Sequence, residues 1–229
     1  MMSLEEGHDE IGLLSDDAAG KNASHQQQSF GLCACFSVEY YRPYFDVDTS
    51  EVIERIRMAF FFCGGPFLDK IADNRADAYG PFWIATTLIF LVSVTSHLQA
   101  LMEFSGDVFE YDFKAVTFSA MVIYSYLGCA AFAVWLGLTY FLKVPIRLLD
   151  CVCIVGYSLC GYLPAAVLCV VPYMRWPACL AACVASSGFA FKALLPAVVN
   201  HAQPQKAAFF GGYAVSNVLF MLCIAFVYK

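Results

Sequence analysis

The chain has 229 residues, of which 60% are hydrophobic and only 14% are charged. Soluble domains have about 45–50% apolar and about 25% charged residues, so a soluble globule of this size could not cover so much apolar surface. The excess has to face lipid, which makes the bilayer the first partner. The formal net charge of −6 argues against nucleic-acid binding, and no nucleic acid is expected as a partner.

The acidic charge is concentrated before the first apolar run. Residues before Pro81 include 14 acidic and 6 basic side chains, whereas the rest of the chain has 5 and 7. We divide the chain into a polar, disordered tail (1–35), a cytosolic juxtamembrane segment (36–80) and a membrane domain (81–229). Residues 1–80, called the arm below, are where soluble partners can bind.

A short amphipathic helix is predicted in the juxtamembrane segment. Asp48 is a plausible N-cap, Glu51 completes a capping box, and Gly64-Gly65-Pro66 ends the helix. At 100° per residue, one face is apolar and the other is charged. The apolar face has Val52, Ile53, Ile56, Ala59, Phe60 and Cys63, and the charged face has Glu51, Glu54, Arg55 and Arg57. The helix either packs against the rest of the protein or docks on a bilayer surface or a partner.

Five apolar runs follow, at about 82–102, 115–142, 149–172, 177–199 and 208–228. Each is near the length of about 20 residues that crosses a bilayer as a helix. We interpret the long second run as one tilted crossing, and Pro164 is expected to interrupt the third. The sequence therefore predicts an all-α membrane protein with five transmembrane helices and a partly disordered cytosolic arm.

Lys and Arg near the ends of the runs predict the orientation. The arm has six basic residues, and Lys143 and Arg147 stand between the second and third runs without an acidic neighbour. The segment from Glu103 to Lys114 has four acids and one base. Because Lys and Arg are enriched in cytosolic loops, the N-terminus is expected in the cytosol and the C-terminus on the opposite side.

The runs lack the residues of a catalytic site. No Asp or Glu lies well inside a run, and no hydrolase, kinase or metalloprotease motif is present. We expect no enzyme activity and no cofactor. Most of the eleven Cys lie in apolar runs without a CxxC pair, so neither a disulfide framework nor a metal site is expected. Lys192 is the one charge inside a run, with either a structural or a transport role, and Ser186 or Ser187 is its candidate partner.

Three motifs occur in order along the chain. The first is Glu39-Tyr40-Tyr41-Arg42-Pro43-Tyr44-Phe45-Asp46-Val47-Asp48-Thr49, and the second, directly before the first run, is Asp77-Ala78-Tyr79-Gly80-Pro81. The third is Gly156-Tyr157-Ser158-Leu159-Cys160-Gly161-Tyr162-Leu163-Pro164. Together they resemble the Yip family of Ypt/Rab-interacting multi-pass membrane proteins, and most closely its Golgi branch with an FDVDT segment. Ala78 and Val155 depart from the family pattern, which has Leu and Tyr there.

The resemblance implies a multi-pass protein of Golgi membranes, cycling with the endoplasmic reticulum or endosomes, with a lumenal C-terminus. It also implies binding to Rab-type small GTPases and to related Yip proteins as homo- or hetero-oligomers, in vesicle-mediated transport and Golgi organisation. The alternative from another class is a small-solute or lipid transporter, or a scramblase-like protein, built around Lys192 and the break at Pro164.

The residues expected to bind partners belong to the first two motifs. They are Tyr40, Tyr41, Phe45, Asp46, Asp48, Asp77, Tyr79, Gly80 and Pro81. The segment Asp77–Pro81, called the joint below, either contacts a partner or only positions the first span, since Pro81 has a preset φ and Tyr79 suits the headgroup layer. In the third span Gly156, Tyr157, Gly161, Tyr162 and Pro164 form a structural motif, because small residues let helices approach closely in lipid.

Overall fold

The computed structural model describes residues 45, 47–61, 67–68, 71, 76–103, 114–199 and 203–228, all within one compact unit, Tyr44–Lys229. All the regular secondary structure in these ranges is helical. The tail, Tyr40, Tyr41 and Asp46 lie outside the described residues. The prediction of an all-α membrane protein with five spans is confirmed, because five helices are long and apolar enough to cross a bilayer.

The spans are formed by α5 (Tyr79–Glu103), α6 (Lys114–Leu136) continued by the π-helix η3 (Gly137–Phe141), α7 (Leu148–Ser158) with η4 (Leu159–Gly161) and α8 (Tyr162–Leu168), α9 (Arg175–Val198) and α10 (Gln203–Val227). The second run is a single crossing, Lys114–Phe141. The third ends at Leu168, four residues before the predicted end, because a turn leads into the short 3₁₀-helix η5 (Pro172–Met174).

Pro164 accounts for the break in the third span. A proline inside a helix lacks the N–H that would bond to the carbonyl four residues earlier, and its ring displaces that carbonyl. Residue 160 is at that position, and the chain is a 3₁₀-helix over Leu159–Gly161 before α8 begins. The predicted interruption is therefore present, centred one turn before the proline.

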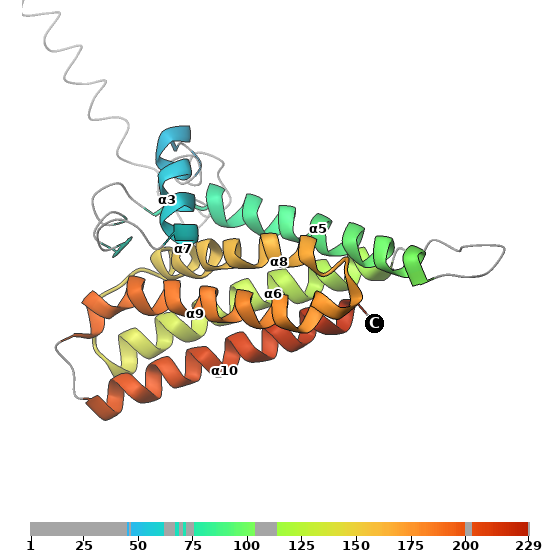
Figure 1. Ribbon diagram of the computed structural model, residues 1–229. Coiled ribbons are helices and arrows are strands. Elements are labelled where there is room, and N and C mark those ends of the chain that lie inside the picture. Colours follow the sequence, from blue (N-terminus) through green and yellow to red (C-terminus); the bar gives the residue numbers. More distant parts are fainter. Residues whose placement is uncertain are drawn as a thin grey trace, which may run out of the picture. The chain divides into compact units, whose positions relative to one another are not determined.

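The spans form a bundle (Figure 1), and the buried residues between them form an apolar core. Helix α5 packs against α6, α7 and α8, while α10 packs against α6 and α9. The third span is the most buried of the five, since 67% of its most apolar stretch lies inside the protein. This explains why the third motif is rich in small and aromatic residues, which have to fit between helices on several sides.

A buried polar network crosses the middle of the bundle. The Tyr162 hydroxyl donates to Asn217 Oδ1 at 2.7 Å, and Asn217 Nδ2 donates to Ser187 Oγ at 2.8 Å. Tyr213 and Ser158 hydroxyls lie 3.2 Å apart nearby. Asn217 is fully buried, so these bonds satisfy polar groups that would otherwise be stranded in an apolar interior, and they join α8, α9 and α10.

Replacing Tyr162 by phenylalanine is expected to lower the apparent Tm of the detergent-solubilised protein, because Asn217 loses one hydrogen bond. Such bonds in membrane proteins contribute about 0.6 kcal/mol on average and about 1.7 kcal/mol at most. The matched control is Tyr140→Phe, because Tyr140 is 67% exposed on η3. Equal thermal unfolding curves for the two variants would show that the network does not stabilise the bundle.

Candidate functional site

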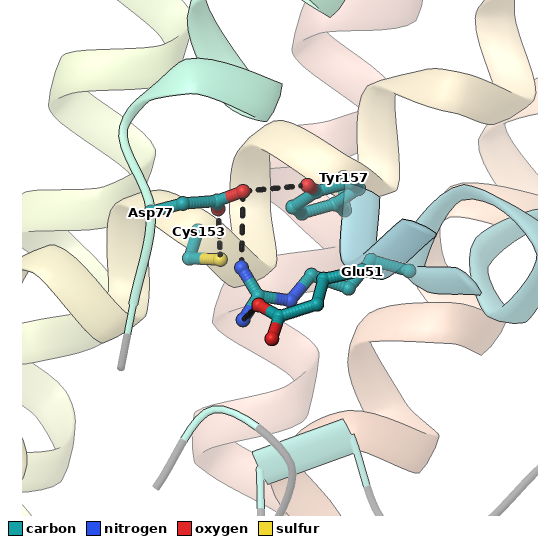
Figure 2. Close-up of polar contacts among 5 residues, drawn as sticks. Glu51, Asp77, Cys153 and Tyr157 are labelled. Atoms are coloured by element: carbon teal, nitrogen blue, oxygen red, sulfur yellow. Dashed lines mark hydrogen bonds and ion pairs between the residues drawn. The ribbon is translucent and has the colours of Figure 1, made fainter. Parts of the chain in front are cut away.

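The site is a cluster of polar side chains that joins α3 (Thr49–Phe61) to the joint and to α7. Arg55 Nη1 lies 3.0 Å from Asp77 Oδ2. The Tyr157 hydroxyl donates to the same carboxylate oxygen at 2.9 Å, and the Cys153 thiol donates to Asp77 Oδ1 at 3.2 Å. Figure 2 shows Tyr157 and Cys153 directed at the two oxygens of Asp77. One carboxylate thus fastens three segments of the chain.

The cluster is buried, so its charges interact strongly. The Arg55 side chain is 4% exposed and that of Asp77 is fully buried. A second pair, Arg55 Nη2 with Glu51 Oε2 at 3.8 Å, is longer and lies at the surface. Ionic interactions are stronger in a low-dielectric interior than in water, but removal of one partner leaves an uncompensated charge. We therefore expect the Arg55–Asp77 pair to decide whether α3 stays attached.

The charge of Arg55 does not change over the physiological pH range. Burial lowers the pKa of the guanidinium, but Asp77 and the groups around it raise it more, so that the pKa lies above the usual value for arginine. A cation whose pKa is raised on folding contributes stability below its unfolded pKa and loses it only at higher pH. The Arg55 side of the pair is therefore unaffected by pH below about 12.

The second and third motifs interlock at this site. A Cβ atom added to Gly80 would overlap the Tyr157 hydroxyl, and one added to Gly156 would overlap the ring of Pro81. The two glycines thus allow α5 and α7 to approach closely, and the approach brings Tyr157 to Asp77. Gly156 lies eight residues after the start of α7, or about 12 Å at 1.5 Å per residue, so the joint packs within the length of the third span.

Helix α3 presents a different face to the bundle from the one predicted. Arg55 was expected on the exposed, charged face but is buried with Met58 and Ala59, whereas Ile53 and Phe60 are 51% and 38% exposed. The periodicity of apolar residues along the helix does not indicate which side is buried here, because that side is set by an ion pair between residues far apart in the sequence. The start of the helix agrees with the prediction, since the amide of Glu51 donates to the Asp48 carbonyl at 3.0 Å.

The predicted partner-binding residues fall into two groups. Phe45 and Asp48 are exposed before and at the start of α3, and Tyr79 is 40% exposed. Asp77, Gly80 and Pro81 are buried. Burial of these three favours the interpretation that the joint positions α5, and leaves Tyr79 as its accessible residue.

Lys192 is exposed on the outside of α9. Of its candidate partners, Ser186 is buried and Ser187 accepts a hydrogen bond from Asn217. Lys192 lines neither of two apolar grooves on the bundle. One, of about 300 Å³, lies between α6 and α10 beside Gly137 and Gly212. The other, of about 260 Å³, lies where Phe60 of α3 meets Pro164 and Ala182.

The contacts at the site hold a helix against the bundle. In the part of the chain that the structure describes, Arg55, Tyr157 and Cys153 contact the two carboxylate oxygens of Asp77. Among the described residues, no group of three or more His, Cys, Asp and Glu side chains could hold a metal ion. What the arrangement can do is couple the position of α3 to the packing of α5 on α7.

The pairing at the site was not predicted from the sequence. Asp77 and Tyr157 belong to separate motifs, Arg55 to the charged face of the predicted helix, and Cys153 to the cysteines of the apolar runs. One signal was available: an acidic residue four positions before Pro81 at the start of an apolar run needs a cation or donors. Nothing in the spacing identifies Arg55 as that cation, because 21 residues separate the two.

These features define a multi-pass helical membrane protein with a buried ion pair where the arm meets the bundle. The chain matches the family described as Yip1 domain over residues 58–227, and it belongs to that family. The match begins within α3 and ends with α10, and it includes the joint and the third-span motif.

Two curated proteins are similar to the chain. It is 38% identical over 138 residues to Protein YIPF1 homolog of Dictyostelium discoideum, and the aligned region covers 60% of this chain and 39% of that protein. It is 33% identical over 131 residues to Protein YIP5 of Schizosaccharomyces pombe, which covers 53% of this chain and 49% of that protein. The matches therefore span less than half the length of these relatives. No solved structure shows a significant match.

Proposed function

We propose that this Yip-family membrane protein is a non-catalytic trafficking factor of the Golgi and early secretory pathway. Its cytosolic arm binds Rab-type small GTPases, the spans associate with related Yip proteins, and the protein supports vesicle-mediated transport and Golgi organisation. The observation that carries the proposal is the attachment of α3: Arg55 fixes one side of the helix on the bundle and leaves Ile53 and Phe61, 51% and 71% exposed, on its outer side.

The outer side of α3 has the composition of a protein-binding surface. Glu54 and Arg57 are exposed together with Ile53, Phe60 and Phe61. Protein interfaces combine an apolar and aromatic centre with a polar rim, and a few anchors such as Phe provide most of the affinity. A helix that is already fixed also loses less conformational entropy when a partner binds. The exposed Phe45 and Asp48 extend this surface toward the tail.

The orientation belongs to the same proposal. An odd number of crossings places the two ends of the chain on opposite sides, and the described spans number five. Lys143 and Arg147, both exposed between η3 and α7, support a cytosolic position for that loop. With α3 on the same side, the N-terminus is cytosolic and the C-terminus lumenal.

The GTPase proposal is tested by co-purification. Tagged full-length protein in mild detergent is incubated with a panel of prenylated Rab GTPases, each in its GTP- and GDP-bound form. We expect Ile53→Glu/Phe61→Glu to recover about ten-fold less GTPase, because loss of an interface anchor costs about 1.4 kcal/mol or more. Ser50→Ala, an exposed change in the first turn of α3, is the control and should recover as much as the unaltered protein.

Point variants test the binding surface more specifically than removal of residues 36–80. That deletion would take Arg55 and Asp77 away and leave Tyr157 and Cys153 without their acceptor, so it would disturb the bundle as well. Equal recovery by the double variant and Ser50→Ala would exclude the outer side of α3 as the binding surface. Recovery of no GTPase by the unaltered protein would refute the proposed binding itself.

The transporter alternative has less support. It was built around Lys192 and Pro164, but Lys192 is exposed on the outside of α9, where its long side chain can extend toward the nearer end of the span. Pro164 lines an outer groove together with α3 and α9. These placements favour structural roles for both residues.

A further inference from the structure

Two thiols face each other at the turn between α8 and α9. Cys169 is the residue after α8, and Cys179 lies in the second turn of α9. Their sulfur atoms are 3.7 Å apart, and both residues are 1% exposed. Because the S–S bond of a disulfide is about 2.05 Å long, the sulfurs need to approach by less than about 2 Å to be bonded.

Hydrogen bonds next to the two cysteines hold the end of α8 close to the start of α9. Arg175, the first residue of α9, donates from Nη1 to the backbone oxygen of Tyr228 at 2.9 Å. The hydroxyl of the same tyrosine donates to the carbonyl of Ala166 in α8 at 3.3 Å. Tyr228 therefore ties α8 to the start of α9 from the C-terminal end of the chain. A bond between Cys169 and Cys179 would close the same turn covalently without moving either helix far.

We infer that Cys169 and Cys179 form a disulfide that closes the α8–α9 hairpin in the mature protein. The inference rests on the proposed orientation, which puts this hairpin on the lumenal side, where the secretory compartment is oxidising enough for disulfides to persist. Arg175 lies one helical turn before Cys179, and a nearby cation favours the reactive thiolate. The sequence did not suggest the pair, because nine residues separate its members and a turn brings them together.

The reaction is a thiol–disulfide exchange with a disulfide oxidant of the lumen, RS–SR. The thiolate of one cysteine attacks the oxidant, forms a mixed disulfide and releases one RSH. The second cysteine then attacks the mixed disulfide, which forms the Cys169–Cys179 bond and releases the other RSH. The two cysteines together lose two electrons and two protons, and the oxidant is reduced to two thiols. Exchange takes place before the hairpin is fully packed, since both thiols are buried in the folded protein.

The disulfide is tested by counting oxidised thiols in the full-length protein made in cells. Cells are quenched with acid, free thiols are blocked with N-ethylmaleimide in denaturing detergent, and the protein is then reduced and labelled with a polyethylene-glycol maleimide. We expect two labels on each chain, and peptide mapping should place both on Cys169 and Cys179. Chains without any label would overturn the inference.

Variants identify the pair and separate this inference from the proposed orientation. Cys169→Ser and Cys179→Ser should each abolish both labels, whereas Cys129→Ser/Cys223→Ser, which changes two exposed cysteines, should retain them. Protease treatment of a C-terminal tag in sealed microsomes reports the orientation independently. Absence of labels with a protected tag refutes the disulfide alone, and absence of labels with a digested tag refutes the orientation together with it.

Discussion

Replacement of Asp77 by alanine is expected to lower the free energy of unfolding by about 3–5 kcal/mol, because it leaves Arg55 buried without its counter-charge. The variant also deprives Tyr157 and Cys153 of their acceptor. Thermal unfolding in detergent measures the effect, and limited proteolysis of α3 shows whether the helix detaches. We expect a lower apparent Tm and faster cleavage within α3.

Glu51 provides the matched control, since it is the other carboxylate beside Arg55. It lies 3.8 Å from the guanidinium and its side chain is 34% exposed, so Glu51→Ala should cost about 1 kcal/mol or less. The double variant Arg55→Met/Asp77→Asn removes both charges and should recover part of the stability lost in Asp77→Ala. If Asp77→Ala is no more damaging than Glu51→Ala, the buried pair does not fasten α3.

Replacement of Gly156 by alanine is expected to be nearly as damaging. The new methyl group would overlap Pro81 and come within 2.8 Å of its Cα atom, so α5 and α7 would have to move apart. Overpacking of this kind costs about 1–3 kcal/mol, and here it also separates Tyr157 from Asp77. The apparent Tm in detergent and protease cleavage of α3 are again the measurements, and both should change together.

Gly128 is the control for this prediction, because a Cβ atom there would meet nothing within 4 Å. Gly128→Ala should be neutral, or stabilising by up to about 1 kcal/mol through helix propensity. The comparison isolates the contact between α5 and α7 from the general effect of alanine in a span. Equal stability of the two variants would mean that the interlocking of Gly156 and Pro81 is not needed for the fold.

The outcome at α3 shows how far helical periodicity can be used. The pattern gave the start of the helix at Asp48 and its amphipathic character, because capping and periodicity are local properties. It placed Arg55 on the exposed, charged face, because periodicity assigns a charged residue to the side that faces water. The side of a helix that is buried depends on what it meets, and here Arg55 meets a carboxylate that precedes another helix.

The sequence by itself determined the five crossings and the break before Pro164. Each of these depends on the composition or stereochemistry of adjacent residues, which a linear pattern contains. Only the tertiary structure decided that Asp77 pairs with Arg55, that Asn217 joins three spans and that Cys169 faces Cys179. Those contacts link residues that turns and helix packing bring together. The sequence alone is compatible with many pairings of its polar groups, and the packing of the helices determines which of them forms.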